Sequence, residues 1–184
     1  MRKQYRWKFL REGMKSDSGD CVWEIGKQKT FKGDLVMCEQ GFHCSKTVWQ
    51  AFSYVQGEIL AQVEVSGTHE TQDDKEVWEK MKIVKAYKWQ KQDSVELAIY
   101  AAELVISIYE KKYPDDDRPR KAIEAAKKYL KNPTKKNQDA AWASAWAARV
   151  AWAAWASGTA ARVEMIEKIA QWMEDRVSSL EEIV

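Results

Sequence analysis

The uneven placement of glycine and alanine is the feature that most constrains this 184-residue chain. Seven of the eight glycines lie within the first 67 residues, whereas most of the alanines lie between Ala98 and Ala161. Regularly spaced glycines are typical of turns between short strands, and alanine is the best helix former. The sequence therefore predicts an α+β chain with a β-rich domain over residues 1–92 and a helical domain over residues 93–184.

The first region predicts strands separated by glycine-containing turns. Strands are expected at residues 5–9, 34–38, 59–65 and 81–89, with a polar segment, 68–76, before the last of them. Apolar residues recur at helical spacing only within residues 47–55, so one short helix is expected there. This pattern predicts a small, mostly antiparallel sheet with one short helix.

The second region has the 3.6-residue periodicity of helices. A first helix is expected to begin with Asp93 or Ser94 as its N-cap and to end at Tyr113-Pro114. Its apolar stripe consists of Val95, Ala98, Ile99, Ala102, Val105, Ile106 and Tyr109. Further helices are expected between Asp117 and Asn132-Pro133, over about 137–157, and from Gly158-Thr159 onward. The prediction is a four-helix bundle rich in alanine and tryptophan.

The expected third helix separates large from small side chains. At about 100° per residue, one half of its circumference carries four tryptophans, namely Trp142, Trp146, Trp152 and Trp155. Arg149 is the only charge between Asp139 and Arg162, and we expect it to form a cation–π contact with its neighbouring tryptophans. The helix is interpreted as the buried centre of the bundle or as an oligomer interface through the tryptophans. A membrane span is not favoured, because alanine, serine and glycine supply little transfer energy.

The charge balance and the cysteines limit the partners and the compartment. The chain has 30 Lys and Arg against 28 Asp and Glu, so its net charge of +2 favours neither nucleic acid nor an anionic membrane as a partner. Its three cysteines do not form a disulfide framework, and no apolar segment follows the basic start. We therefore expect a cytoplasmic protein in the cytosol of its host cell.

The sequence offers few groups for catalysis or metal binding. Cys38, His43 and Cys44 lack the close spacing of a structural zinc site, so no metal is expected. Cys38 is interpreted as a core strand residue, Cys44 as the start of the short helix, and His43 as a corner residue that bonds local backbone or points into a cleft. The acidic run Asp115–Asp117 is expected to cap a helix, with ion pairs to Arg118 and Arg120.

No phosphate-binding loop, hydrolase elbow or metalloprotease motif is present in the sequence. Neither a catalytic residue nor a cofactor is therefore predicted.

Two segments resemble known families. The run Met37-Cys38-Glu39-Gln40-Gly41-Phe42-His43-Cys44-Ser45, followed by a Val63-Glu64-Val65-Ser66-Gly67 strand, resembles an N-terminal domain of unknown function that is widespread in phage and prophage proteins. The segment from Tyr109 to Ala126, with its Asp116-Asp117-Arg118-Pro119-Arg120 core, resembles the helical domain of proteins called putative immunity proteins. These resemblances imply a phage or other mobile element as the source and imply no particular reaction.

A third similarity suggests an alternative enzyme function. Gly41-Phe42-His43-Cys44-Ser45 and the strand that ends at Gly67 are similar in order to a segment of ADP-ribosyltransferases. This resemblance implies that His43 replaces the tyrosine that stacks on nicotinamide and that Arg6 grips the cofactor. Glu76 or Glu79 would then serve as the catalytic glutamate of an NAD-using enzyme.

The favoured hypothesis is a non-catalytic binding protein of phage or mobile-element origin. Its partner is expected to be a host protein or a small nucleotide-like ligand, and its effect the inhibition of a host defence system. The candidate ligand-binding residues are Arg6, His43 and Arg149, and the candidate interface residues are the four tryptophans at 142, 146, 152 and 155. The alternatives are the ADP-ribosyltransferase-like enzyme and a structural homo-oligomer.

Overall fold

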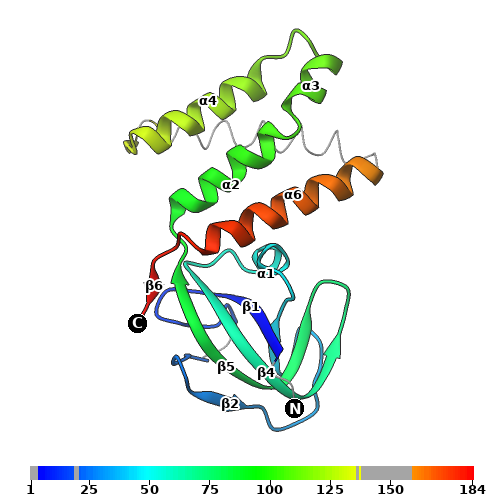
Figure 1. Ribbon diagram of the computed structural model, residues 1–184, viewed down its shortest axis with the longest axis vertical. Helices are drawn as coiled ribbons and strands as arrows, with labels where there is room; N and C mark the ends of the chain where they lie inside the picture. The colour runs from blue at the N-terminus through cyan, green and yellow to red at the C-terminus, as the bar shows by residue number, and fades with distance from the viewer. Residues whose placement is uncertain (1–3, 19–20, 136, 138–158) are drawn as a thin grey trace. The chain divides into compact units, whose positions relative to one another are not determined.

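The structure is a computed structural model that describes residues 4–18, 21–135, 137 and 159–184 (Figure 1). Contacts divide the chain into two units, one made of Met1–Trp89 with Trp172–Val184 and the other of Gln90–Gln171. The described residues form one six-stranded sheet and five helices, which confirms the predicted α+β class. The third expected helix lies almost wholly outside these residues, so the four-helix bundle stays a prediction.

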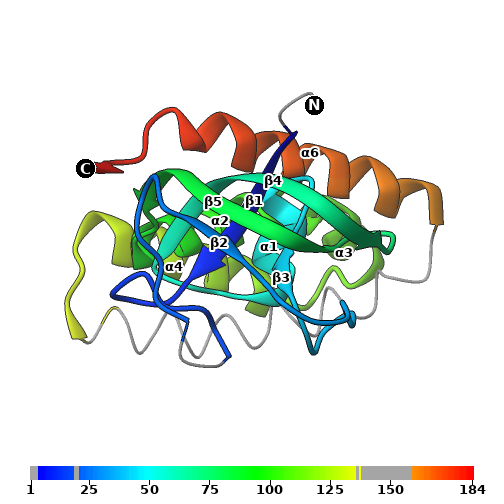
Figure 2. The same cartoon turned by 90° about the horizontal axis from the view of Figure 1, so that it is seen from below.

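A long hairpin of two neighbouring strands forms the centre of the sheet (Figures 1 and 2). It consists of β4 (Ile59–Thr71) and β5 (Glu76–Lys88). β1 (Gln4–Leu10) lies along the other edge of β4. The free edge of β5 pairs with three short strands, β3 (Phe42–Cys44), β2 (Gln28–Thr30) and β6 (Glu182–Ile183). All these pairings are antiparallel, in agreement with the prediction.

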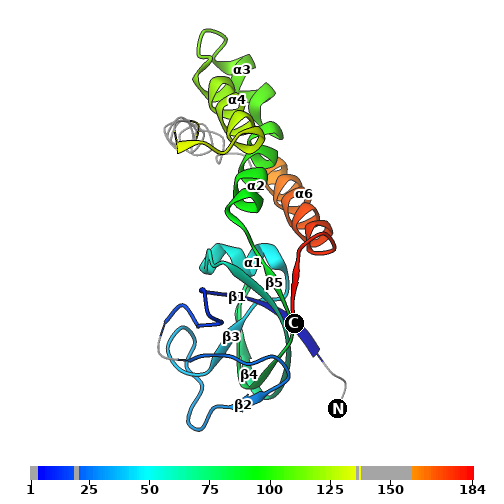
Figure 3. The same cartoon turned by 90° about the vertical axis from the view of Figure 1, so that its left-hand side faces the viewer.

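Backbone hydrogen bonds close part of the sheet into a ring (Figure 3). The amide of Trp7 on β1 donates to the carbonyl of Ser45 at 2.8 Å, and the amide of Ser45 donates to the carbonyl of Trp7 at 2.9 Å. Ser45 directly follows β3, so the order of strands runs from β1 through β4, β5 and β3 back to β1. Side chains on the inner face of these strands therefore converge on one interior.

The interior of the ring is the main hydrophobic core. Alternate residues of β4 point into it, because side chains along a strand alternate between the two faces. The buried core residues are Leu10, Trp23, Cys44, Ile59, Ala61, Val63, Val65, Trp78, Met81, Ile83 and Ala86. Arg6 lies opposite Val63, and Lys8 lies opposite Ala61, so both basic side chains share the inner face with the core.

The outer face of the sheet carries helix α1 (Val48–Tyr54). Thr47 begins this helix with a reciprocal capping box, in which its hydroxyl accepts from the Gln50 amide and the Gln50 side chain accepts from the Thr47 amide. Phe52 of α1 packs edge-on against Phe9 of β1, with a ring-centre distance of 5.3 Å, and both rings contact Trp89. The helix expected at residues 47–55 is thus present.

The second unit contains α2 (Lys91–Glu103), α3 (Ile106–Lys112) and α4 (Arg118–Lys131). Ile99, Ile106 and Ile123 form the buried centre of these helices. The helix α6 (Thr159–Val177) begins in this unit and ends in the first one. The positions of α4 agree with prediction, since Pro119 lies in its first turn and Asn132 is its C-cap.

One local prediction about the first unit was wrong. Residues 34–38 form no strand, because Cys38 and Gly41 have positive φ angles of 68° and 110° and the chain turns between Val36 and Gln40. A Cβ at Gly41 would lie only 2.5 Å from Val77 Cγ2, so glycine is required there. In the polar segment, residues 68–71 belong to β4 and Glu76 belongs to β5, so the two strands extend past the core as a hairpin.

The prediction of one continuous helix from residue 93 to residue 113 was also wrong. The helix is interrupted at residues 104–105, where the Val105 amide bonds the Ala102 carbonyl in a tight turn. This turn allows Ile106 to join the cluster of Ile99 and Ile123. The N-cap of α2 is Gln90 and neither Asp93 nor Ser94. The Gln90 amide donates to the Asp93 carboxylate at 2.6 Å, so Asp93 completes the cap from within the first turn of the helix.

Candidate functional site

An ion pair inside the ring joins two residues that the sequence singled out separately. Arg6 Nε lies 2.7 Å from Oε2 of Glu76, the first residue of β5. The indole nitrogen of Trp78 donates to the same oxygen at 2.8 Å. Burial raises the pKa of Glu76, but the hydrogen bonds from Arg6 and Trp78 and the charges of Arg6 and Lys46 outweigh it, so the pKa is lowered. Glu76 is therefore a buried, ionised anchor for Arg6.

His43 lies on the opposite face of the strands from this ion pair. It stands between Phe42 and Cys44, which contact the core, and it lies opposite Val77 in the register. Its Nε2 accepts a hydrogen bond from the Cys38 amide at 2.8 Å, which requires a neutral ring. Burial and the nearby charges of two lysines lower the pKa of His43, in keeping with that state. The side chains of Arg6 and His43 therefore do not form one site.

The cysteines occupy places that differ from the prediction. Cys38 is exposed in a turn, where its sulfur lies 2.8 Å from Lys75 Nζ, and it is not a core strand residue. Cys44 lies in β3 rather than at the helix, and burial raises the pKa of its thiol to about 12. Lys8 is its neighbour, and burial lowers the pKa of this lysine, whose Nζ donates to the His43 carbonyl at 2.9 Å.

The residues proposed for an NAD-using enzyme are engaged elsewhere. Arg6 and Glu76 neutralise one another, and Glu79 accepts hydrogen bonds from the amide and hydroxyl of Thr68, each at 3.1 Å. His43, the proposed nicotinamide neighbour, is bonded to the backbone of Cys38. Within the described part of the chain, no three or more His, Cys, Asp or Glu side chains are grouped to hold a metal ion.

Arg149 and the four tryptophans at 142, 146, 152 and 155 lie outside the described residues, so their roles as ligand and interface residues stay predictions. Of the helices that the structure does describe, none combines the length and the apolar character that crossing a membrane requires.

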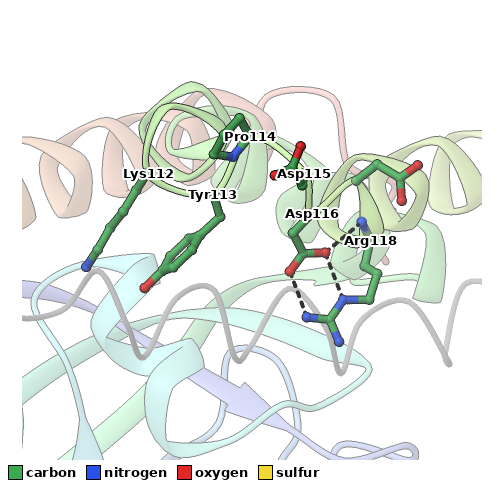
Figure 4. A pocket seen from close by; sticks show the side chains of 7 residues that line it. Lys112, Tyr113, Pro114, Asp115, Asp116 and Arg118 are labelled. Carbon is green, nitrogen blue, oxygen red and sulfur yellow. Dashed lines mark hydrogen bonds and ion pairs between the residues drawn. The ribbon is translucent and has the colours of Figure 1, made fainter.

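The second unit presents a surface where α3 meets α4, which we call the α3–α4 corner and define as residues 108–118. A depression of about 550 Å³ is lined by residues 112–118 (Figure 4). Asp116 holds the corner together, because it accepts hydrogen bonds from the Tyr109 hydroxyl at 2.7 Å and from the Arg118 side chain at 2.7 and 2.8 Å. The bonds from Arg118 and Tyr109 keep the pKa of Asp116 well below its usual range.

One of the two ion pairs expected from the sequence is present at the corner, and the other arginine pairs elsewhere. Arg118 pairs with Asp116, whereas Arg120 pairs with Glu110 of α3, at 2.6 Å, and not with the acidic run. Asp117 is the N-cap residue of α4, but its carboxylate pairs with Lys121 instead of bonding first-turn amides. Tyr113 and Ile108 remain 40% and 44% exposed beside these charges. The corner thus combines fixed charges with exposed apolar area.

Sequence reasoning named Arg6 and Glu76 but did not pair them with each other. Arg6 and Glu76 are 70 positions apart, and only the ring of strands brings them together. Tyr109 and Asp116 were both noted in the sequence, but their hydrogen bond was not predicted. It depends on the conformation of the loop between the two helices. A spacing of seven residues across Pro114 carries no helical or strand periodicity that could have indicated it.

Two family models match the chain. Residues 5–94 match a domain of unknown function, DUF7666, and residues 87–163 match a family described as "Imm-5 like putative immunity protein". Comparison with curated proteins and with solved structures gave no match. The chain therefore carries a DUF7666-like region followed by an Imm-5-like region, which confirms both family resemblances at this level. An immunity-type region fits a non-catalytic interaction role.

Proposed function

We propose that this protein is a non-catalytic binding protein that acts by contacting another protein through the α3–α4 corner. The match of residues 87–163 to an immunity-protein family carries the proposal, because these residues include the whole corner. Immunity, in the sense of that name, is a protective effect. Direct contact with a harmful protein supplies such an effect without any chemical step.

The corner has the physical properties of a protein-binding surface. Tyrosine and arginine are enriched among the residues that dominate binding energy, and both occur here as Tyr113 and Arg118. The hydrogen bonds to Asp116 fix the loop in advance, so the loop loses little conformational entropy when a partner binds it. The engagement of Arg6, His43 and Glu76 within the first unit supports binding over catalysis as well.

The finer form of the proposal concerns the source and the partner. In this form the protein belongs to a phage or another mobile element, acts in the host cytosol and blocks a host defence protein. The resemblance of the first region to phage and prophage domains is its support. Sequestration of a nucleotide signal is the competing form, with Arg149 as its remaining candidate residue.

Site-specific photo-crosslinking in the native host cell tests the proposal. A benzophenone amino acid replaces Tyr113 or, as a matched control, Tyr5, which is a similarly exposed tyrosine at 48%. We expect one discrete protein adduct from position 113 and none of that mass from position 5. The purified partner should then bind the unmodified protein and lose at least about tenfold in affinity with Tyr113→Ala, as a hot-spot residue predicts.

Two results would overturn this proposal. One is the same adduct pattern from both positions, or no adduct from Tyr113. The other is a covalent change in the partner, or consumption of NAD, that depends on this protein.

A further inference from the structure

A second concave surface lies in the first unit, between the outer face of the sheet and residues 174–182. This groove has a volume of about 470 Å³, within the roughly 300–1,000 Å³ typical of ligand sites. Its floor crosses three strands, with Trp7 opposite Gln62 and Gln62 opposite Lys85 in the register. Tyr87 follows on β5. The wall is formed by Glu174, Val177, Ser178, Leu180 and Glu182.

Hydrogen bonds attach the wall of the groove to the first unit, which also forms its floor. The Val48 amide donates to Oε1 of Glu174 at 3.0 Å, and the Lys88 amide donates to the Glu181 carbonyl at 2.9 Å. β6 then pairs with Ala86 and Tyr87 of β5. The groove is therefore formed before any ligand arrives.

The floor carries polar groups that no described residue satisfies. In the part of the chain that the structure describes, nothing hydrogen-bonds the indole nitrogen of Trp7, the side-chain amide of Gln62 or the hydroxyl of Tyr87. Trp7 and Tyr87 are half-buried, so each presents an apolar ring and a polar group at the groove surface. Among the described residues, no buried side-chain polar atom lacks a partner, so these three groups reach solvent and are open to a polar ligand.

The charges of the groove select a cation. Two carboxylates, Glu174 and Glu182, face one ammonium, Lys85, which lies 3.5 Å from Glu182 and is half exposed. A phosphate would meet a net negative surface. A planar cation instead gains from the aromatic faces of Trp7 and Tyr87 and from a charge-assisted bond to a carboxylate.

We propose that this groove binds a guanidinium group, which stacks on Trp7 or Tyr87 and donates hydrogen bonds to Glu174. Guanidinium is the planar cation that combines stacking with forked hydrogen bonding to a carboxylate. The site goes beyond the proposed function, because the α3–α4 corner belongs to the other unit. Neither family match extends to residues 174–182, so the wall is a feature of this chain outside both matched regions.

Isothermal titration calorimetry on the full chain tests the site with three probes. Agmatine represents a free guanidinium compound, and the peptide Gly-Gly-Arg-Gly-Gly represents an arginine side chain of a polypeptide. The same peptide with citrulline is the control, since it has nearly the same shape without the charge. We expect citrulline to reduce the affinity at least about tenfold, as loss of a charge-assisted bond predicts. Preference for agmatine or for the arginine peptide identifies the source of the ligand.

Matched variants locate the binding. Glu174→Gln keeps an oxygen for the Val48 amide and should weaken binding about tenfold, through loss of the charge. Glu181→Gln removes the same charge outside the groove lining and should change affinity less than about twofold, as for an exposed charge. Tyr87→Leu leaves the hydrogen bond between the Val48 amide and Glu174 in place and should also weaken binding. Equal effects of Glu174→Gln and Glu181→Gln, equal binding of arginine and citrulline peptides, or no binding of either guanidinium probe would each overturn the proposal.

Discussion

Glu76 concentrates several interactions of the first unit on a single side chain. It is 2% exposed, and its carboxylate accepts from Arg6 and from the indole of Trp78. We predict that Glu76→Gln lowers the free energy of unfolding by about 2 kcal/mol at pH 7, because the buried partners lose a charged acceptor. Urea unfolding measures this change. Glu70→Gln, an exposed change on the neighbouring strand, is the control and should leave stability nearly unaltered.

The Glu76→Gln variant also tests how the free energy of unfolding depends on pH. The pKa of Glu76 in the folded chain lies below its ordinary value of 4.5, so ionisation of this group stabilises the fold above pH 4.5. That contribution is lost as the pH falls through the lowered pKa. The difference between wild type and Glu76→Gln should therefore be constant near neutral pH and should shrink below pH 4.5. A difference that grows on acidification would contradict the assignment.

The cysteines should differ in reactivity. Cys38 is exposed, with the Lys75 ammonium 2.8 Å from its sulfur, whereas burial raises the pKa of Cys44 to about 12. We predict that iodoacetamide alkylates Cys38 first and reaches Cys44 only after unfolding, because Cys38 is exposed whereas Cys44 is buried and its pKa is raised. Peptide mass spectrometry over time measures the order. Lys75→Met should slow the alkylation of Cys38, while Lys27→Met, at a distant exposed lysine, should not.

At the scale of elements, the sequence indicated structure wherever a local pattern sufficed. The alternation of residues 5–9 located β1, and Pro119 with Asn132-Pro133 located both ends of α4. The turn at Cys38 and the break at Val105 were missed, because a local pattern does not show that Gly41 lies against Val77 or that Ile106 packs with Ile123. For the same reason Arg6 and Glu76 were both named as candidates but not as partners in one ion pair, and the groove, whose wall comes from residues 174–182, was not anticipated.

The α3–α4 corner provides a prediction about an element boundary. Tyr109→Phe removes the hydroxyl that donates to Asp116 at 2.7 Å and leaves the ring in place. We expect faster hydrogen exchange of the Asp116 and Arg118 amides, which bond the Tyr113 carbonyl and the Asp116 carboxylate. Exchange within β4 should not change. Tyr113→Phe, in the same loop, is the control, and an equal effect of both variants would refute the role given to Asp116.

At the scale of the whole molecule, the first unit is assembled from both ends of the described chain. Met173 is fully buried and Glu174 bonds α1, so residues 172–184 complete this unit. We predict that a fragment of residues 1–94 gains thermal stability when residues 172–184 are attached through a flexible glycine-serine linker. The gain should be at least about 4 °C, the shift for roughly 1 kcal/mol in a small domain. Differential scanning calorimetry measures it, and attachment of a scrambled 172–184 segment should give no gain.

The two-part construction of the first unit has a consequence for biosynthesis. Residues 90–171 must be translated between the end of β5 and the segment that completes the sheet unit. At ~5–20 residues per second, this interval lasts about 4–16 s. The short-range contacts of α2 and α4 form far faster than that. On the ribosome, the immunity-like helices therefore begin to fold before Met173 and the wall of the groove have been synthesised.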